Sequence, residues 1–144
     1  FGIDAYCLNW RGQDWHFIGY VEDEPVSHVG ALVHDVSVEG SPVRVGGIAA
    51  VVTIPSVRGK GYARRTLRAA LVFLKDDQDA EFGFLFCIDR MIPFYQKMGW
   101  RKITDPVIVD QPQGKIPYPM NVMVLPFRNE EWPKGTVELN SWPW

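Results

Sequence analysis

One stretch of the sequence decides the fold: Val51-Val52-Thr53-Ile54-Pro55-Ser56-Val57-Arg58-Gly59-Lys60-Gly61-Tyr62-Ala63. It runs from a β-branched apolar segment through a glycine-rich turn into a helical pattern. A helix that begins at such a turn has backbone N–H groups without partners and a partial positive charge, which favour phosphate oxygens. Gly59 and Gly61 permit positive φ and close approach of a ligand, and Arg58 and Lys60 add full charges. The stretch therefore predicts an anion-binding loop.

The spacing of this loop distinguishes it from two common phosphate-binding motifs. A P-loop needs Gly-x-x-x-x-Gly-Lys-Ser/Thr, and a dinucleotide fingerprint would need a third glycine where Arg64 stands. An ordinary strand-to-helix turn with two incidental glycines is the structural alternative. The pattern Arg58-x-x-Gly61-x-Ala63 resembles the pyrophosphate loop of the GNAT superfamily of N-acetyltransferases, which binds the pantetheine and pyrophosphate arm of acetyl-CoA.

Three strands are expected before the loop, and a helix and a buried strand after it. Apolar patterning and turn residues delimit strands over Asp14 to Val21, Val26 to Val38 and Val43 to Ile54. From Ala63 to about Asp76 the apolar residues recur at helical spacing, and Phe82 to Ile88 is an unbroken apolar run typical of a strand buried on both faces. The order predicts three antiparallel strands and a fourth strand that pairs parallel with the third.

A second signature follows the buried strand: Met91-Ile92-Pro93-Phe94-Tyr95-Gln96-Lys97-Met98-Gly99-Trp100. Pro93 suits a first helical turn, and Gly99 suits the residue that ends the helix. The pattern Phe-Tyr-x-x-x-Gly-aromatic resembles the GNAT helix that flanks the CoA thiol, and the two signatures together are far more specific than either alone. The resemblance implies a mixed α+β fold, with helices flanking a mostly antiparallel sheet that contains a splayed parallel strand pair.

The resemblance also implies roles for individual residues. Acetyl-CoA is the implied co-substrate, and Tyr95 is the implied general acid that protonates the leaving CoA thiolate. A phenol with a pKa of about 10 stays protonated at neutral pH, whereas a thiol has a pKa of about 8.5. A packing role beside other aromatic residues is the alternative for Tyr95. The residues implied in cofactor binding are Val51, Val52 and Thr53 on the strand edge and Arg58, Gly59, Lys60, Gly61, Tyr62 and Ala63 in the loop.

The general base is where the sequence departs from the GNAT pattern. Many relatives have a glutamate nine residues before the loop's first residue, but this position is Ala49, and no carboxylate occurs from Val43 to Arg58. The alternatives are a remote group acting through water, an amine that arrives neutral, the C-terminal carboxylate of Trp144, or Asp89. Asp89 is equally suited to be a helix N-cap, and we favour that interpretation.

Length and composition predict one domain over residues 1–144, and the resemblance implies that it is a GNAT-like domain that lacks its N-terminal strand or helix. The chain has 47% hydrophobic residues and a net charge of −2, which argues against nucleic-acid binding through bulk phosphate contacts. No apolar run approaches the roughly 20 residues of a membrane span, so a cytoplasmic location is expected. Cys7 and Cys87 are expected to be small buried hydrophobes. The histidines, His16, His28 and His34, lack metal-ligand spacing, so no metal site is expected.

The two ends of the chain are less informative. Phe1 to Trp10 mixes two periodicities and is interpreted as the end of a helix. Short strands are expected at Trp100 to Ile103, Val107 to Val109 and Asn121 to Leu125, with the proline-rich segment between them as loop or sheet edge. The tail from Phe127 onwards is expected to cover the core with its tryptophans, Trp132, Trp142 and Trp144. Its sequence weakly resembles the C-terminal end of aminoglycoside 2′-N-acetyltransferases.

These patterns predict an acetyl-CoA-dependent transferase that acts on a primary amine of a small molecule. A catalytically silent acyl-CoA sensor, a peptide or protein N-acetyltransferase and a scaffolding module are the alternatives, and a homodimer is left open. The acidic balance and the Glu22-Asp23-Glu24 turn favour a cationic acceptor, and the tail favours amino sugars.

Overall fold

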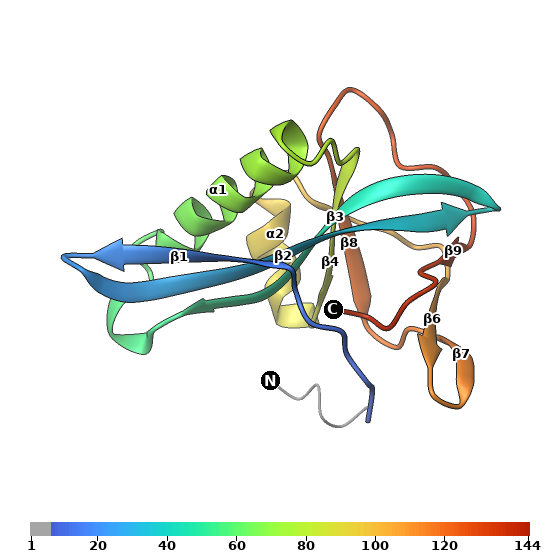
Figure 1. The fold of residues 1–144 in the computed structure, drawn as a ribbon, viewed down its shortest axis with the longest axis horizontal. Coiled ribbons are helices and arrows are strands. Elements are labelled where there is room, and N and C mark those ends of the chain that lie inside the picture. The colour runs from blue at the N-terminus through green and yellow to red at the C-terminus, as the bar shows by residue number, and fades with distance from the viewer. Residues whose placement is uncertain (1–6) are drawn as a thin grey trace.

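The computed structural model describes residues 7–144 and contains a nine-stranded mixed sheet (Figure 1). The sheet order is β5-β8-β4-β3-β2-β9-β6-β7, and β1 pairs with β2 outside this path. The strands are β1 (Trp15–Val21), β2 (Glu24–Val38), β3 (Ser41–Thr53), β4 (Phe82–Cys87), β5 (Arg101–Lys102), β6 (Val107–Gln111), β7 (Gly114–Pro117), β8 (Asn121–Pro126) and β9 (Val137–Glu138). The helices are α1 (Tyr62–Asp76) and α2 (Ile92–Gln96), with short 3₁₀ turns η2 (Pro55–Val57) and η3 (Asp89–Met91).

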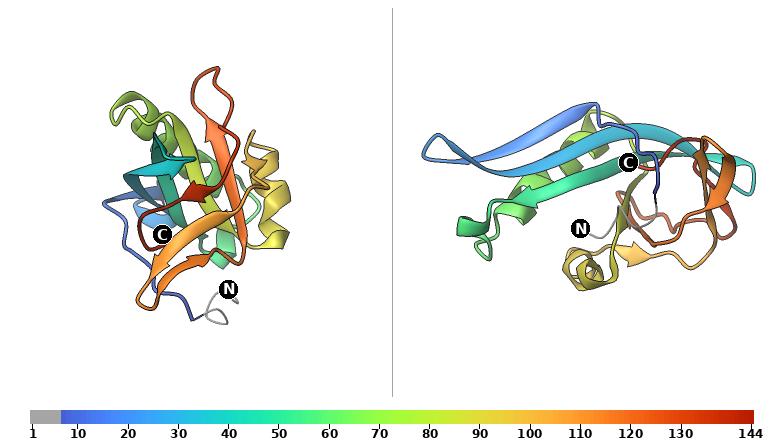
Figure 2. Two further views of the ribbon diagram at one scale, coloured as in Figure 1. Left: turned by 90° about the vertical axis from the view of Figure 1, so that its right-hand side faces the viewer. Right: turned by 90° about the horizontal axis from the view of Figure 1, so that it is seen from below.

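The first three strands form the antiparallel ribbon that the sequence predicts. β1 pairs with β2, and β2 pairs with β3 along most of its length. Both hairpin turns use left-handed backbone, with Glu39 and Gly40 at φ values of 47° and 82° in the second turn. A two-residue turn of this hand matches the right-handed twist of the strands it joins. The turn between β1 and β2 lies at the end of the molecule opposite to β6 and β7, whereas the turn between β2 and β3 lies at the same end as β9, β6 and β7 (Figures 1 and 2).

The unit β3–α1–β4 confirms the predicted parallel pair. β4 pairs parallel with β3 from Phe82 opposite Val45 to Leu85 opposite Ile48. α1 buries Leu67, Ala70 and Leu74, whose spacing of three and four residues places them on one helix face. β4 is almost wholly buried because β3 and β8 flank it and both of its faces are covered.

Different segments of the chain pack on the two faces of the sheet. Both helices belong to one apolar cluster, which includes Leu85 and Trp100. Phe84 and Phe86 alternate with Leu85 along β4 and contribute to a second apolar cluster. Phe84 and the C-terminal Trp144 are members of this cluster, and Phe86 packs against it. Successive side chains of a strand point to opposite faces, so the helices cover one face and the C-terminal segment covers the other.

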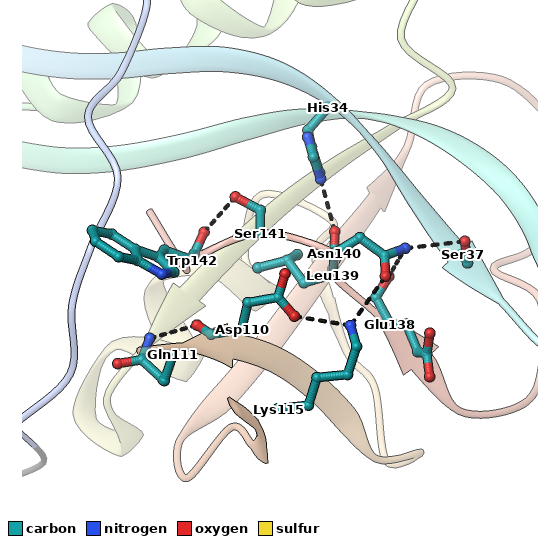
Figure 3. Close-up of polar contacts among 10 residues, drawn as sticks. All are labelled: His34, Ser37, Asp110, Gln111, Lys115, Glu138, Leu139, Asn140, Ser141 and Trp142. Atoms are coloured by element: carbon teal, nitrogen blue, oxygen red, sulfur yellow. Dashed lines mark hydrogen bonds and ion pairs between the residues drawn. The ribbon is translucent and has the colours of Figure 1, made fainter. Parts of the chain in front are cut away.

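Polar contacts fix the C-terminal segment against β2 and β6 (Figure 3). His34 donates from Nε2 to the carbonyl oxygen of Leu139 at 2.7 Å, and Asn140 donates to the Ser37 hydroxyl at 3.3 Å. Lys115 of β7 pairs with Asp110 of β6 at 2.8 Å and also donates to the Asn140 side-chain oxygen of the C-terminal segment at 3.3 Å. These contacts, with the short strand β9 between β2 and β6, bring Trp144 into the core at 5% exposure.

The C-terminal half agrees in part with the sequence-based expectations. β5, β6 and β8 lie where strands are predicted, and β7 forms a sheet edge in the proline-rich segment. β9 is not predicted, because two residues paired to distant strands leave no local signal. Of the predicted tryptophan cover, Trp132 packs against the core and Trp144 is buried, but Trp142 is 40% exposed.

The N-terminal stretch requires corrections. Residues 1–6 of the expected helix end, Phe1 to Trp10, lie outside the described residues, and residues 7–10 form neither helix nor strand. Cys7 is exposed, so its prediction as a buried hydrophobe is wrong, whereas Cys87 is buried. Asp89 is not an N-cap: the cap position of η3 is Ile88, and the Asp89 carboxylate accepts a hydrogen bond from Asn121 at 2.7 Å instead. Within residues 7–144, no helix has the length and apolar character needed to cross a membrane.

Candidate functional site

The candidate site begins where β3 and β4 separate. Their pairing ends at Ile48 opposite Leu85, although β3 continues to Thr53 alongside β2 and β4 continues to Cys87 alongside β8. Ala50 has a φ of 48°, at the point where the register between β2 and β3 shifts. Such a bulge bends its strand and interrupts the ladder. The backbone of β3 beyond Ile48 therefore has a free edge on the side of β4.

A slot of about 190 Å³ occupies the opening between the two strands. Its walls come from both separated strands, from η3 and from α2. Tyr95 reaches the slot from α2, and Cys87 reaches it from the end of β4. The full lining is Ile48, Ala49, Ala50, Val51, Val52, Leu85, Phe86, Cys87, Ile88, Arg90, Met91 and Tyr95.

The glycine loop adjoins the slot and has the backbone geometry of an anion site. Gly59 and Gly61 have φ values of 79° and 84°, and Gly61 is the N-cap of α1, whose first turn contains no acidic residue. A Cβ atom at either glycine would meet no neighbour within 4 Å, so the space above these amides is open. Arg58 donates from Nε to the Thr53 carbonyl at 3.1 Å, which ties the loop to the end of β3.

The structure gathers the predicted cofactor residues around one pocket of about 570 Å³, with one exception. Val51, Val52, Thr53, Arg58, Gly59, Gly61, Tyr62 and Ala63 line it, and Lys60 does not. Arg64 lines the pocket from the first turn of α1, and Arg90, Met91 and Phe94 line it from η3 and α2. Three of these, Arg90, Met91 and Phe94, were missed by sequence reasoning as cofactor contacts. The sequence contained a signal for these contacts. The three residues follow the carboxyl end of β4, in the Phe-Tyr signature or directly before it.

Tyr95 is held rigidly at the base of the slot. Its side chain is 5% exposed and packs edge-on against Phe94 and Trp100, with centroid distances of 5.0 and 5.9 Å. Burial, and secondarily the neighbouring Cys87, raise the pKa of the phenol well above its usual value of 10. The raised pKa keeps the hydroxyl protonated throughout the neutral and mildly alkaline range, so that Tyr95 is available as a proton donor.

Cys87 lies beside this phenol and is held as a neutral thiol. Burial, with a smaller contribution from the Asp89 carboxylate, raises its pKa to about 11, while Lys102 acts in the opposite direction. The thiolate is the reactive form of cysteine. Cys87 is therefore an unreactive wall of the slot at neutral pH, despite its position near the place where a thioester would lie.

Alkylation at about pH 7.5 should distinguish the two cysteines. Cys7 is exposed, whereas the raised pKa of Cys87 should make its modification at least about 100-fold slower. Peptide mass spectrometry after timed exposure to iodoacetamide measures both rates in the same sample. A Cys7→Ser variant isolates the slow phase, and equal rates for the two thiols would contradict the assignment.

A third pocket of about 380 Å³ opens on the far side of the slot. It shares Ala49, Ala50, Phe86, Cys87 and Ile88 with the slot, so that the loop, the slot and this pocket form one continuous path. The other residues of its lining are Trp10, Arg11, Gln13, Tyr118, Met120 and Trp144.

No aspartate or glutamate side chain of the described residues lines any part of this path. Ala49, at the position where many relatives have glutamate, faces both the slot and the third pocket. Asp89 lines none of the three cavities. The nearby His28 bonds to the Ala50 carbonyl at 2.7 Å and to His16 at 2.9 Å, but its side chain lines a different groove. No group of three or more metal-ligating side chains was found in residues 7–144.

One family profile matches the part of the sequence that forms most of this site. The profile described as an acetyltransferase (GNAT) domain matches residues 9–103, which include β1 to β4, the glycine loop, α1 and α2. Curated protein sequences give no match.

Solved structures share the fold at low sequence identity. A GNAT family acetyltransferase from Brucella melitensis in complex with acetyl-CoA is 16% identical, with a TM-score of 0.60, 88% of this chain covered and 66% of that chain. The GNAT family N-acetyltransferase YhbS from Escherichia coli in complex with CoA is 17% identical, with a TM-score of 0.63 and coverages of 90% and 68%. A GCN5-related N-acetyltransferase from Kribbella flavida is 24% identical, with a TM-score of 0.53, and the match spans 58% of this chain and 21% of that one.

Proposed function

Because the chain belongs to the GNAT acetyltransferase family, we propose that it transfers the acetyl group of acetyl-CoA to a primary amine of a small molecule. The observation that carries this proposal is the continuous path from the glycine loop through the slot to the third pocket. One end of this path suits a pyrophosphate, and the other end leaves room for an acceptor.

The cofactor would lie along the free edge of β3. Its pyrophosphate would bind the amides around Gly61 and the first turn of α1, where the helix dipole favours negative charge. Arg58, Arg64 and Arg90 line the same pocket and would add charge to it. The pantetheine would follow Val51 to Thr53, which brings the thioester into the slot beside Tyr95.

The chemistry would be direct attack by the amine. The nitrogen lone pair forms a bond to the thioester carbonyl carbon, the carbon–sulfur bond breaks, and the thiolate receives the proton of the Tyr95 hydroxyl. The Tyr95 phenolate then regains a proton from solvent before the next turnover. The neutral amine gives up its own proton to solvent as the amide forms. No aspartate or glutamate side chain of residues 7–144 lines the path, so we infer an amine that arrives unprotonated. Trp144, whose terminal carboxylate is an alternative base, lines the third pocket.

Acetyl-CoA should stabilise the folded protein. A ligand that binds only the native state adds roughly 2.7 kcal/mol at about 100 times its Kd. Thermal melts with and without acetyl-CoA measure this directly, and an unchanged Tm at millimolar ligand would contradict cofactor binding.

The chain offers a closely matched pair of glycines for this test. Gly61 and Gly40 have φ values of 84° and 82°, and a Cβ at either would meet nothing within 4 Å. Alanine at either position should therefore cost about 1 kcal/mol of backbone strain. Only Gly61→Ala places a methyl group in the proposed phosphate site, so it alone should weaken acetyl-CoA binding, by about tenfold or more. Equal loss of binding in both variants would show that strain is responsible.

An acyl-CoA-binding module without turnover is the second candidate. The observation in its favour is Ala49, which leaves the slot without the strand glutamate that many relatives have. Release of CoA thiol on a panel of amines, amino sugars and peptides separates the two functions. Acetyl-CoA binding without CoA release on any amine would favour the binding module.

A further inference from the structure

The third pocket carries one side-chain cation and no side-chain carboxylate among the described residues. We propose that it selects acceptors that combine the reacting amine with a carboxylate and an apolar body. This inference rests on the proposed transferase function and names the substrate class for the same site. The cavity of about 380 Å³ lies within the range of small-molecule sites.

Aromatic rings form the apolar part of the pocket. Phe86 packs against Tyr118 and Trp144 with centroid distances of 4.4 and 5.4 Å, and Trp10 meets Phe86 edge-on at 6.5 Å. Tyr118 and Trp144 are 8% and 5% exposed, so their rings are held in place by packing. A rigid aromatic wall favours an apolar ligand surface over a chain of hydroxyl groups.

Arg11 supplies the charge, and its side chain is held in place by β2 and the C-terminal segment. Its backbone N–H donates to the Pro143 carbonyl at 2.8 Å, and its Nη1 lies 3.3 Å from His34 Nδ1 and 3.5 Å from the Ser141 hydroxyl. Within residues 7–144, Arg11 forms no ion pair. These side-chain contacts use Nη1 alone, which leaves Nε and Nη2 as the forked donor pair that fits a carboxylate.

His34 acts as the positioning residue for this guanidinium. A carbonyl only accepts, so His34 Nε2 carries the proton that is donated to Leu139 at 2.7 Å (Figure 3). Nδ1 is then the acceptor for Arg11 Nη1. The imidazole also packs against Trp144, with a centroid distance of 5.9 Å. The charge and the aromatic wall are thus fixed relative to each other.

The local charge of the pocket is opposite to the acidic balance of the chain. The Glu22-Asp23-Glu24 turn, which favours a cationic acceptor in the sequence, joins β1 to β2 and lines none of the three cavities on the path. A polyamine or an aminoglycoside would place further cations near Arg11. Electrostatic complementarity at the site therefore favours an amine with an anionic group.

Matched pairs of amines test this proposal. Phenylalanine and phenethylamine differ in the carboxylate, and 6-aminohexanoate and 1,6-diaminohexane exchange a carboxylate for a cation. We expect kcat/KM, measured by CoA release at one pH and corrected for the neutral fraction of each amine, to favour the carboxylate member of at least one pair by about 10- to 100-fold, as for a hydrogen bond to a charged group. Preference for the diamine or for aminoglycosides would overturn the proposal.

Arg11→Gln should lower kcat/KM more for the carboxylate member of a pair than for its partner, so that the preference falls to about onefold. Arg68→Gln is the control, because Arg68 is exposed on α1 and lines none of the three pockets, and it makes the same change in net charge. If Arg11→Gln lowers both members of a pair equally, Arg11 is structural and the proposal fails. CoA release on any amine of the panel supports the proposed function whichever member of a pair is preferred, so turnover without the carboxylate preference overturns this proposal alone.

Discussion

Replacing Tyr95 with phenylalanine should lower kcat by about 10²- to 10⁴-fold, the usual contribution of a positioned general acid. Tyr95 lines the slot where the thioester would lie, and the raised pKa of its hydroxyl keeps the proton on the oxygen. The variant retains the ring that packs against Phe94 and Trp100, so folding and acetyl-CoA affinity should change little.

Steady-state kinetics together with a melt measure both parts of this expectation. Tyr20→Phe is the matched control, because Tyr20 is 63% exposed on β1 and lines none of the cavities of the path. The decrease should be in kcat, with the acetyl-CoA-dependent rise in Tm preserved. A Tyr95→Phe enzyme with the kcat of the unmodified chain would exclude Tyr95 from proton transfer.

The rate should also rise steeply with pH. Only a neutral amine attacks, and for an alkyl amine with a pKa of about 10.4 the neutral fraction grows about tenfold per pH unit. We therefore expect kcat/KM to increase by about 10³-fold from pH 6 to pH 9. Tyr95 and Cys87 produce no opposing decrease in this range, because both pKa values are raised, that of Cys87 to about 11, so that both groups keep their protons.

A profile that is level above about pH 6.5 would contradict this expectation and reveal a dedicated base. His28 is the residue to test in that event, since it contacts the Ala50 carbonyl beside the slot. A His28→Gln variant that restored the tenfold slope would identify it as that base. The same slope in both proteins would leave the neutral amine as the attacking species.

Local sequence patterns were sufficient for most of the fold around the loop. The β-branched run that ends at Thr53, the glycines at 59 and 61 and the apolar spacing of α1 are each determined by neighbours in the chain. Their boundaries in the structure differ from the predicted ones by a few residues at most. The run from Phe82 onwards is apolar enough that its burial between two strands was predictable. Tyr95 was predicted from its resemblance to a GNAT signature, which is continuous in sequence, and its role as general acid stays a prediction.

The third pocket depended on the tertiary structure. Arg11, Phe86 and Trp144 come from three separate parts of the chain, and β9, which helps to position the C-terminal segment, has only two residues. The sequence around Arg11 does not indicate that its side chain would lie in a pocket with aromatic rings. It also does not indicate that Arg11 would form no ion pair with a carboxylate of residues 7–144. His34, which lies 3.3 Å from Arg11 Nη1, is itself bonded to the Leu139 carbonyl of the C-terminal segment. Figure 3 shows this bond between His34 and Leu139.

The sequence by itself determined the strand-to-helix loop, the parallel pair and the position of the phenol, because hydrophobic period, turn chemistry and helix termini act over a few residues. Only the tertiary structure decided the separation of β3 from β4, the raised pKa values of Tyr95 and Cys87 and the charge of the third pocket. These properties arise from burial and from side chains that are distant in sequence, and the electrostatic effect of a neighbour depends on its distance in space.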